Sequence, residues 1–211
     1  TILCSIIKDI TEYKDTKVYL EKNTNILIHL LGSVIKFKIE YKKHHGKKVA
    51  QLSSKLGRKI GLSPGRLDTL YKASILHDIG MLSIPTSILN KPSKLTPNEY
   101  NLIKEHPQIG YKFLRNFDFN KSISPAKIIL QHHERIDGSG YPNGLKNKNI
   151  LTEAKILGVA DVIISMTSKR PYREAHSIKF ALNYINNNSK FDNKIVNICI
   201  DLFKKNNYDI S

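Results

Sequence analysis

Cysteine is nearly missing from this sequence, and tryptophan is missing altogether. The 211 residues include two cysteines, Cys4 and Cys199, which form neither a CxxC pair nor the pattern of a disulfide framework. Zinc ribbons and disulfide-stapled secreted scaffolds are therefore excluded. Such cysteine usage is typical of a reducing compartment, so we expect a cytoplasmic protein.

Long apolar runs are also lacking. The most apolar stretch near the N-terminus, Ile26–Ile39, is interrupted by His29, Lys36 and Lys38. It is too short and too charged to cross a bilayer, so we expect no membrane segment in this chain.

Acidic residues are scarce relative to basic ones. The chain has 34 Lys and Arg against 18 Asp and Glu, which gives a formal net charge of +16. Such a charge favours anionic partners such as nucleotides. Most of the excess is lysine in a sequence also rich in Ile and Asn, as A/T-rich codon usage produces. We therefore expect no specific nucleic-acid surface, and the basic stretch Lys42–Lys59 is interpreted as a solvated helix face.

Glycine is infrequent, with 11 residues, and apolar residues recur three and four positions apart over long segments. This periodicity predicts helices, and no segment has the alternating pattern of a strand. The expected fold is an all-α bundle of about seven or eight helices. One or two helices are expected over 26–62, with others at 66–79, 99–117, 125–134, 153–168, 176–185 and 194–204. Residues 1–25 are more polar and are expected to be a linker or a small helical cap, ahead of a domain over 26–211.

Histidine and aspartate side chains stand where helices should bury their apolar faces. They are His45, His77, Asp78, His106, His132, His133 and Asp161. Buried groups of this kind need partners, and helical bundles build metal sites from such side chains on facing helices. Imidazole and carboxylate without thiolate suit Fe, Mn, Zn, Ni or Co better than Mg or Ca. Five histidines and two aspartates are too many for one ion with open positions, but they suit two ions if Asp78 bridges them.

Each of these residues also has an ordinary structural explanation. A lone buried histidine such as His106 is more often a hydrogen-bonded core residue than a ligand. The pair His132–His133 could be a solvated helix end, and Asp161 could pair with Arg170 or Arg173. The other histidines, His29, His44 and His176, are expected to be surface or structural residues, although spacing alone does not separate His44 from His45.

Five motifs follow one another along the chain. They are HDIGMLSIP at 77–85, EHPQIG at 105–110, HHERIDGSGYP at 132–142, VAD at 159–161 and RPYR at 170–173. Together they resemble the HD-GYP family, a subset of the HD-domain metal phosphohydrolases. The resemblance implies that residues 26–211 are an all-α catalytic domain. It also implies hydrolysis of the bacterial second messenger cyclic di-GMP to pGpG and, in some members, on to GMP.

The resemblance further implies the metal ligands. It places the early ligand at His45 rather than His44, and one ion on His45, His77, Asp78 and Asp161. The second ion would be held by Asp78, His106, His132 and His133. Members with a third ion have a glutamate where Tyr41 stands, so two divalent ions are expected, Fe or Mn first, with Zn, Ni or Co as alternatives. A hydroxide bridging the two ions would be the nucleophile, with His77 and Asp78 as catalytic residues.

Substrate contacts are implied in the same way. Arg170 and Arg173 match family positions that contact the substrate phosphates, a role suited to arginine. Tyr141 is expected either to stack on a guanine or to pack on the core. Gly140 and Pro142 flank it in a loop that would shape the rim of the site or a surface for signalling partner proteins. Glu134 is expected to orient a ligand histidine.

One departure from the family pattern concerns the substrate site. Met81 stands where the family usually has a lysine that reaches the substrate phosphate, and methionine supplies no charge. Ile164 and Lys169 stand where the family often has aspartate, but neither position is a ligand. Met81 keeps two alternatives open: a receptor or scaffold that hydrolyses slowly or not at all, and a phosphohydrolase for another nucleotide.

Overall fold

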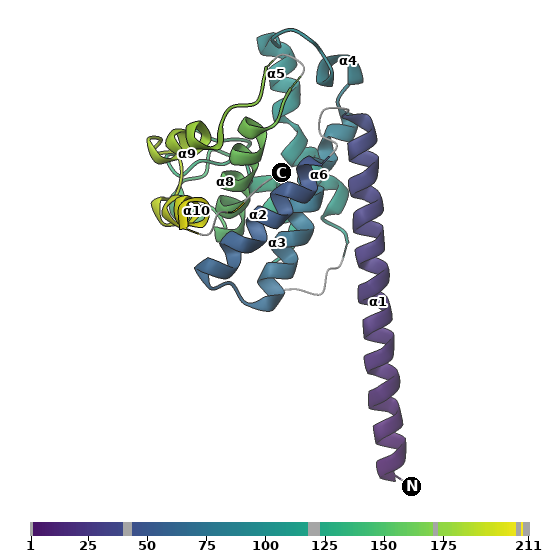
Figure 1. Ribbon diagram of the computed structural model, residues 1–211. Coiled ribbons are helices and arrows are strands. Elements are labelled where there is room, and N and C mark those ends of the chain that lie inside the picture. Colours follow the sequence, from purple (N-terminus) through teal and green to yellow (C-terminus); the bar gives the residue numbers. More distant parts are fainter. Residues whose placement is uncertain (1, 40–43, 118–122, 171–172, 206–207, 209–211) are drawn as a thin grey trace.

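The computed structural model describes residues 2–39, 44–117, 123–170, 173–205 and 208 (Figure 1). Within these residues the chain is helical, and extended pairing is limited to two isolated bridges, so the all-α prediction is confirmed. The elements are α1 (Ile2–Lys38), α2 (His45–Ile60), α3 (Pro64–Leu76), η2 (Ile79–Ser83), α4 (Thr86–Leu89), α5 (Pro97–Lys104), α6 (His106–Leu114), α7 (Pro125–Gln131), η3 (Asn147–Asn149), α8 (Thr152–Thr167), α9 (Ile178–Asn186) and α10 (Asn193–Lys205).

The core is built around α8, whose residues 156–161 are all buried. Helices α2, α3, α7, α9 and α10 contact it from different sides. On α2 the buried residues Val49, Leu52 and Leu56 recur at helical spacing, so one face of that helix packs against α3 and α8. This central position of α8 brings Asp161 into the middle of the bundle.

The single helix expected over residues 99–117 is two helices, α5 and α6, which meet at Glu105–His106. Pro107 explains the break, because it has no amide hydrogen to donate and favours the first turn of a new helix. The start of α5 is fixed by a capping box, in which Thr96 accepts from the Glu99 amide and Glu99 accepts from the Thr96 amide. At the new helix start, His106 is fully buried.

A close approach between η2 and α6 holds the His77–Asp78 segment beside His106. A Cβ atom on Gly80 would overlap the carbonyl group of His106 and would also crowd the amide of Gly110. Glycine is therefore the residue that this contact allows. The glycine that follows the HD pair in the sequence thus serves to bring two distant segments together.

Helix α1 is longer than the sequence pattern indicates. It runs from Ile2 to Lys38 without a break and so passes through the boundary expected after residue 25. Its C-terminal part packs on α3 and η2, whereas its N-terminal part projects from the body of the molecule (Figure 1). Among the described helices, none combines the length and the apolar character that crossing a bilayer requires.

Candidate metal centre and substrate cleft

Three histidines of the site are oriented by the same kind of local hydrogen bond. Each lies at the end or the beginning of a helix and places its ring Nδ1 against the carbonyl oxygen three residues earlier. The pairs are His77 with Ser74 at 2.7 Å, His106 with Ile103 at 2.7 Å and His132 with Ile129 at 2.6 Å. Because a carbonyl oxygen only accepts, each Nδ1 donates its proton, and each Nε2 carries the lone pair.

The Nε2 atoms of His106 and His132 lie 3.3 Å apart in the interior. Burial, together with the neighbouring His106 and His77, holds the pKa of His132 well below its ordinary value. The ring of His132 is therefore expected to be neutral near pH 7, with its Nε2 lone pair available to bind a cation. The donor set in this part of the structure thus fits a divalent metal ion.

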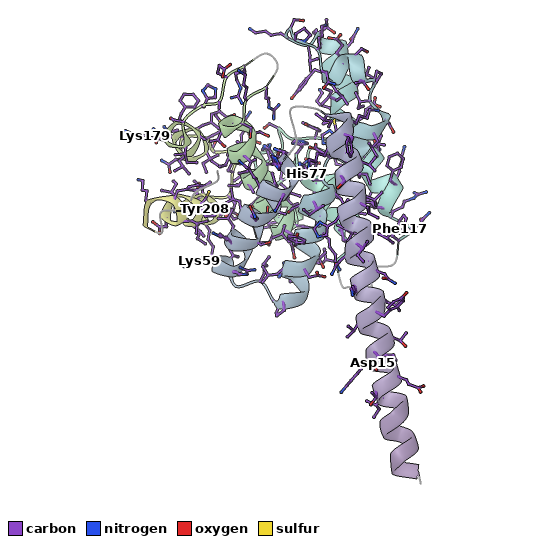
Figure 2. All side chains as sticks on the ribbon, turned by 45° about the vertical axis from the view of Figure 1, so that its right-hand side comes forward. Asp15, Lys59, His77, Phe117, Lys179 and Tyr208 are labelled. Atoms are coloured by element: carbon purple, nitrogen blue, oxygen red, sulfur yellow. The ribbon has the colours of Figure 1, made fainter. Side chains whose placement is uncertain are left out.

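Two groups of donors can be distinguished. His106, His132 and His133 have ligand atoms within 4.8 Å of one another, and so do His45, His77 and Asp161. Figure 2 shows His77 within the helical body of the molecule. Residues from α2, α3, α6, α7 and α8 thus converge on one place.

Asp78 lies between the two groups. Its Oδ2 atom is 3.2 Å from Nε2 of His77 and 4.0 Å from Nε2 of His45, and its Oδ1 atom is 3.8 Å from Nε2 of His106. One carboxylate therefore faces donors of both groups, one oxygen to each. This is the arrangement that a bridging ligand requires.

The structure separates His45 from His44 by burial, and the ligand role that the resemblance implies for His45 stays a prediction. His45 is buried and its Nε2 atom lies 3.0 Å from Oδ1 of Asp161, whereas His44 is exposed at the N-cap of α2. Burial opposes ionisation of Asp161, but the hydrogen bond from His45 and the surrounding imidazoles outweigh it, so the pKa of this carboxyl lies well below its ordinary value. Asp161 also accepts a hydrogen bond from Ser165.

The remaining histidines are not members of these two groups, although His29 and His44 line a cavity that also contains His45 and His77. His29 and His44 are exposed, and His176 stacks on Phe180 with a ring-centroid distance of 4.4 Å. Tyr41, on which the expectation of two rather than three ions depends, lies outside the described residues.

A cleft of about 760 Å³ opens over the centre. Its lining includes Asp78, His106, His133 and Asp161, together with several basic and aromatic side chains. The volume lies within the ordinary range of small-molecule sites. The basic residues of the lining are Lys104, Arg135, Arg170, Arg173 and Lys190, and the aromatic ones are Tyr100, Tyr141, Tyr184 and Phe191.

Two arginines of the cleft donate hydrogen bonds to backbone carbonyls. Arg173 donates to the carbonyl of Ser165 at 2.7 Å, and its backbone is paired with that of Arg170. Arg135 donates to the carbonyl of Glu134 at 2.8 Å and lies over the ring of Phe191. Sequence reasoning selected Arg170 and Arg173 but missed Arg135. Its position directly after the His132–His133–Glu134 run could have indicated a place in the site.

The loop after His133 packs back on the centre. The ring of Tyr141 stacks on that of His133, with centroids 4.7 Å apart and an interplanar angle of 27°. Burial raises the pKa of the Tyr141 phenol, so it stays protonated. A Cβ atom on Gly140 would overlap the backbone of Glu134 and Arg135, so this turn requires glycine. The peptide bond between Tyr141 and Pro142 is cis.

Glu134 holds this loop in place. Its carboxylate accepts hydrogen bonds from the amides of Asn143 at 2.7 Å and Leu145 at 2.9 Å. These contacts fix the loop that carries Tyr141, whereas the expected role of orienting a ligand histidine stays a prediction.

Met81, one turn after Asp78, is a buried residue of the cleft lining.

A smaller cavity of about 280 Å³ reaches the centre from the side of α1. It is lined by His45, His77 and Asp78 together with α1 residues that include Gly32, Ser33 and Lys36. The two cavities share Asp78.

Comparison with known proteins shows the family of this chain. A sequence model described as the HD domain matches residues 27–195, which is most of the chain. The chain belongs to the HD domain family. The HD-GYP resemblance inferred from the motifs is confirmed as well.

Curated relatives of this HD domain act on cyclic dinucleotides. The cyclic di-GMP phosphodiesterase response regulator RpfG of Xanthomonas campestris is 42% identical over 138 residues. The 3'3'-cGAMP-specific phosphodiesterase 1 of Vibrio cholerae is 34% identical over 173 residues. The matches cover 65% and 82% of this chain but 36% and 39% of those proteins, so the chain spans less than half the length of these relatives.

A solved structure shares the fold. A HDG"Y"P protein from Bdellovibrio bacteriovorus matches with a TM-score of 0.64 over 85% of this chain and 63% of that chain. At 23% identity this likeness supports the helical architecture alone.

Proposed function

We propose that this HD domain is a metal-dependent phosphodiesterase that hydrolyses cyclic di-GMP to pGpG, with GMP as a further product. The observation that carries the proposal is the position of Asp78. It joins two histidine-rich donor groups at the floor of a cleft lined by arginines. A cyclic dinucleotide has two phosphates and two flat bases, and the cleft offers basic and aromatic side chains for both. The names of the curated relatives support this substrate class.

Two divalent ions are proposed, Fe or Mn, with Zn, Ni or Co as alternatives. His45, His77, Asp78 and Asp161 would hold one, and Asp78, His106, His132 and His133 the other. When bound, such ions supply Lewis-acid stabilisation of phosphate oxygens and lower the pKa of water. The backbone carbonyls that fix the rings of His77, His106 and His132 keep their Nε2 atoms in place before any ion arrives.

The other residues of the cleft would bind and orient the substrate. Arg170 and Arg173 would contact the phosphates, and Arg135 adds a third guanidinium to the same cleft. Tyr141 already stacks on His133, so we assign it to positioning that ring as well as to the wall against which a base would lie. Met81 contributes no charge to the phosphate site.

A second candidate substrate is 3'3'-cGAMP, favoured by the Vibrio cholerae relative that matches 82% of this chain. The two substrates differ in one base and share both phosphates, so the metal and arginine contacts do not separate them. Discrimination would rest on the aromatic walls formed by Tyr100, Tyr184 and Phe191.

We also propose a bacterial cytoplasmic location, which the cysteine usage supports. The loop around Gly140 and Pro142 presents the exposed residues Ser139 and Asn143, and it is our candidate surface for signalling partner proteins.

The test is direct hydrolysis. The purified chain is incubated with cyclic di-GMP or 3'3'-cGAMP, with Mn²⁺ or anaerobic Fe²⁺, and products are separated by chromatography. Asp78→Ala serves as the inactive variant, and Asp201→Asn, an exposed position on α10, serves as the control. Linear product from the native chain and the control but not from Asp78→Ala supports the proposal. No product from either substrate, with two ions present by elemental analysis, would replace it with a receptor or another nucleotide substrate.

A further inference from the structure

Helix α1 carries an apolar stripe with a spacing of seven residues. Tyr13, Leu20, Leu27 and Val34 fall on this spacing, and their exposed fractions are 70%, 58%, 59% and 49%. Ile10, Leu30 and Phe37 flank the stripe and are also exposed. From Tyr13 to Val34 the stripe covers 22 residues, or about 32 Å of helix.

This stripe is not the face with which α1 packs on its own domain. The residues of α1 that join the core are Ile28 and Ile35, which are buried, and Leu31, which is half-buried. Ile39, close after the helix, is buried with them. Leu27 and Val34 each precede one of these buried residues by one position, which turns them by about 100° around the helix. One side of the helix is therefore covered by the domain, and a second apolar side is exposed.

The exposed part of α1 extends well beyond the domain. In Figure 2 the side chain of Asp15 projects from a stretch of helix that is far from the other elements. A helix in water gains most of its stability from packing an amphipathic face, and an isolated helix of this length is marginal. The spacing of the apolar residues indicates what packs there, since a strict seven-residue repeat produces a left-handed supercoil with a similar helix.

We propose that the α1 stripe pairs with the α1 stripe of a second copy of this chain as a parallel, two-stranded coiled coil. Fourteen side chains, counted over both copies, that each bury roughly 80 Å² give about 1,100 Å², which exceeds the ~1,000 Å² expected of a specific interface. The parallel orientation follows from the extent of the stripe. It continues to Val34, beside the domain, where an antiparallel partner would bring its free N-terminal arm against that domain.

One polar residue beside the stripe, Thr24, is compatible with the pairing. Thr24 lies along the edge of the stripe, and its hydroxyl already donates to the carbonyl of Leu20 at 2.8 Å. The group is therefore satisfied within its own helix and would need no partner at the seam.

The first experiment measures molar mass by sedimentation equilibrium on the full chain. The native protein is expected at twice the 24.1 kDa of one chain. Leu20→Glu places a charge in the stripe of both copies, and we expect it to raise the dissociation constant by roughly 100-fold or more. Val18→Glu is the matched control, because Val18 lies on the same stretch of helix, is 64% exposed and stands off the stripe. A native mass of one chain, or equal effects of the two variants, would overturn the proposal.

Orientation is tested by cross-linking in a Cys4→Ser background, in which the other cysteine, Cys199, is buried. In a parallel pair each Leu27 faces its own counterpart, so Leu27→Cys should form a disulfide-linked pair under mild oxidation, whereas Val18→Cys should not. A native mass of two chains without a Leu27→Cys cross-link would contradict the parallel seam. Neither measurement uses hydrolysis, so the result does not depend on the proposed activity.

Discussion

Replacing Asp78 by asparagine tests the centre most sharply, because asparagine keeps the volume of the side chain and removes its charge. The seven donors include two carboxylates, so the site offers two negative charges against the four positive charges of two divalent ions. The variant leaves Asp161 as the remaining carboxylate, 3.0 Å from His45. The three-histidine group loses the anion that lies 3.8 Å from His106.

We therefore expect Asp78→Asn to lose the ion at His106, His132 and His133 and to reduce turnover by at least about 1,000-fold, equivalent to ~4 kcal/mol of activation free energy. Elemental analysis gives ions per chain, and initial rates of cyclic di-GMP hydrolysis give turnover. Asp201→Asn should match the native protein in both. A variant that retains two ions and more than about a tenth of native turnover would refute the bridging role.

Three further predictions follow from other parts of the molecule. Met81→Lys adds a cation to the cleft and should lower the KM for substrate roughly tenfold. Unchanged or weaker binding in a substrate titration would show that the arginines already neutralise the substrate phosphate. Arg66→Met leaves the fully buried Glu153 without the guanidinium that now lies 2.6 Å away. The free energy of unfolding, measured with denaturant, should therefore fall by about 3 kcal/mol. A fall below about 1 kcal/mol would count against a stabilising role of this ion pair. In metal-free protein, burial lowers the pKa of His132 and His133, so the unfolded chain binds more protons below pH ~6.5. Stability should then fall by about 1 kcal/mol for each histidine between pH 6.5 and 5.5, and flat stability over that range would contradict neutral burial.

The sequence was most informative where a polar group had to be compensated in a buried place. His77 follows an apolar run and Asp161 lies inside one, and a core cannot hold such groups without partners. The structure brings them together with His45, Asp78, His132 and His133, which the motifs had assigned to one centre. Helical spacing likewise predicted the class of the fold, because bundle cores follow from it directly.

Other features depended on contacts that spacing does not encode. The division of residues 99–117 into α5 and α6 depends on one proline and on the burial of His106. The stacking of Tyr141 on His133 and the two loop amides bound by Glu134 require the folded loop. The length of α1 was underestimated because residues 1–25 are more polar than the segment after them, and helix length there is not set by burial in the domain.

The small cavity beside α1 gives the centre a second accessible side. Under the proposed function a nucleotide would enter by the cleft, whereas Gly32, Ser33 and Lys36 line the smaller cavity together with His45 and His77. These wall residues and the projecting arm belong to one unbroken helix. A displacement of the arm along its axis therefore displaces the cavity wall by the same distance, without passing through the substrate cleft. Under the proposed function, the substrate would reach Asp78 through the cleft, whereas a movement of α1 would reach it through the wall of the smaller cavity.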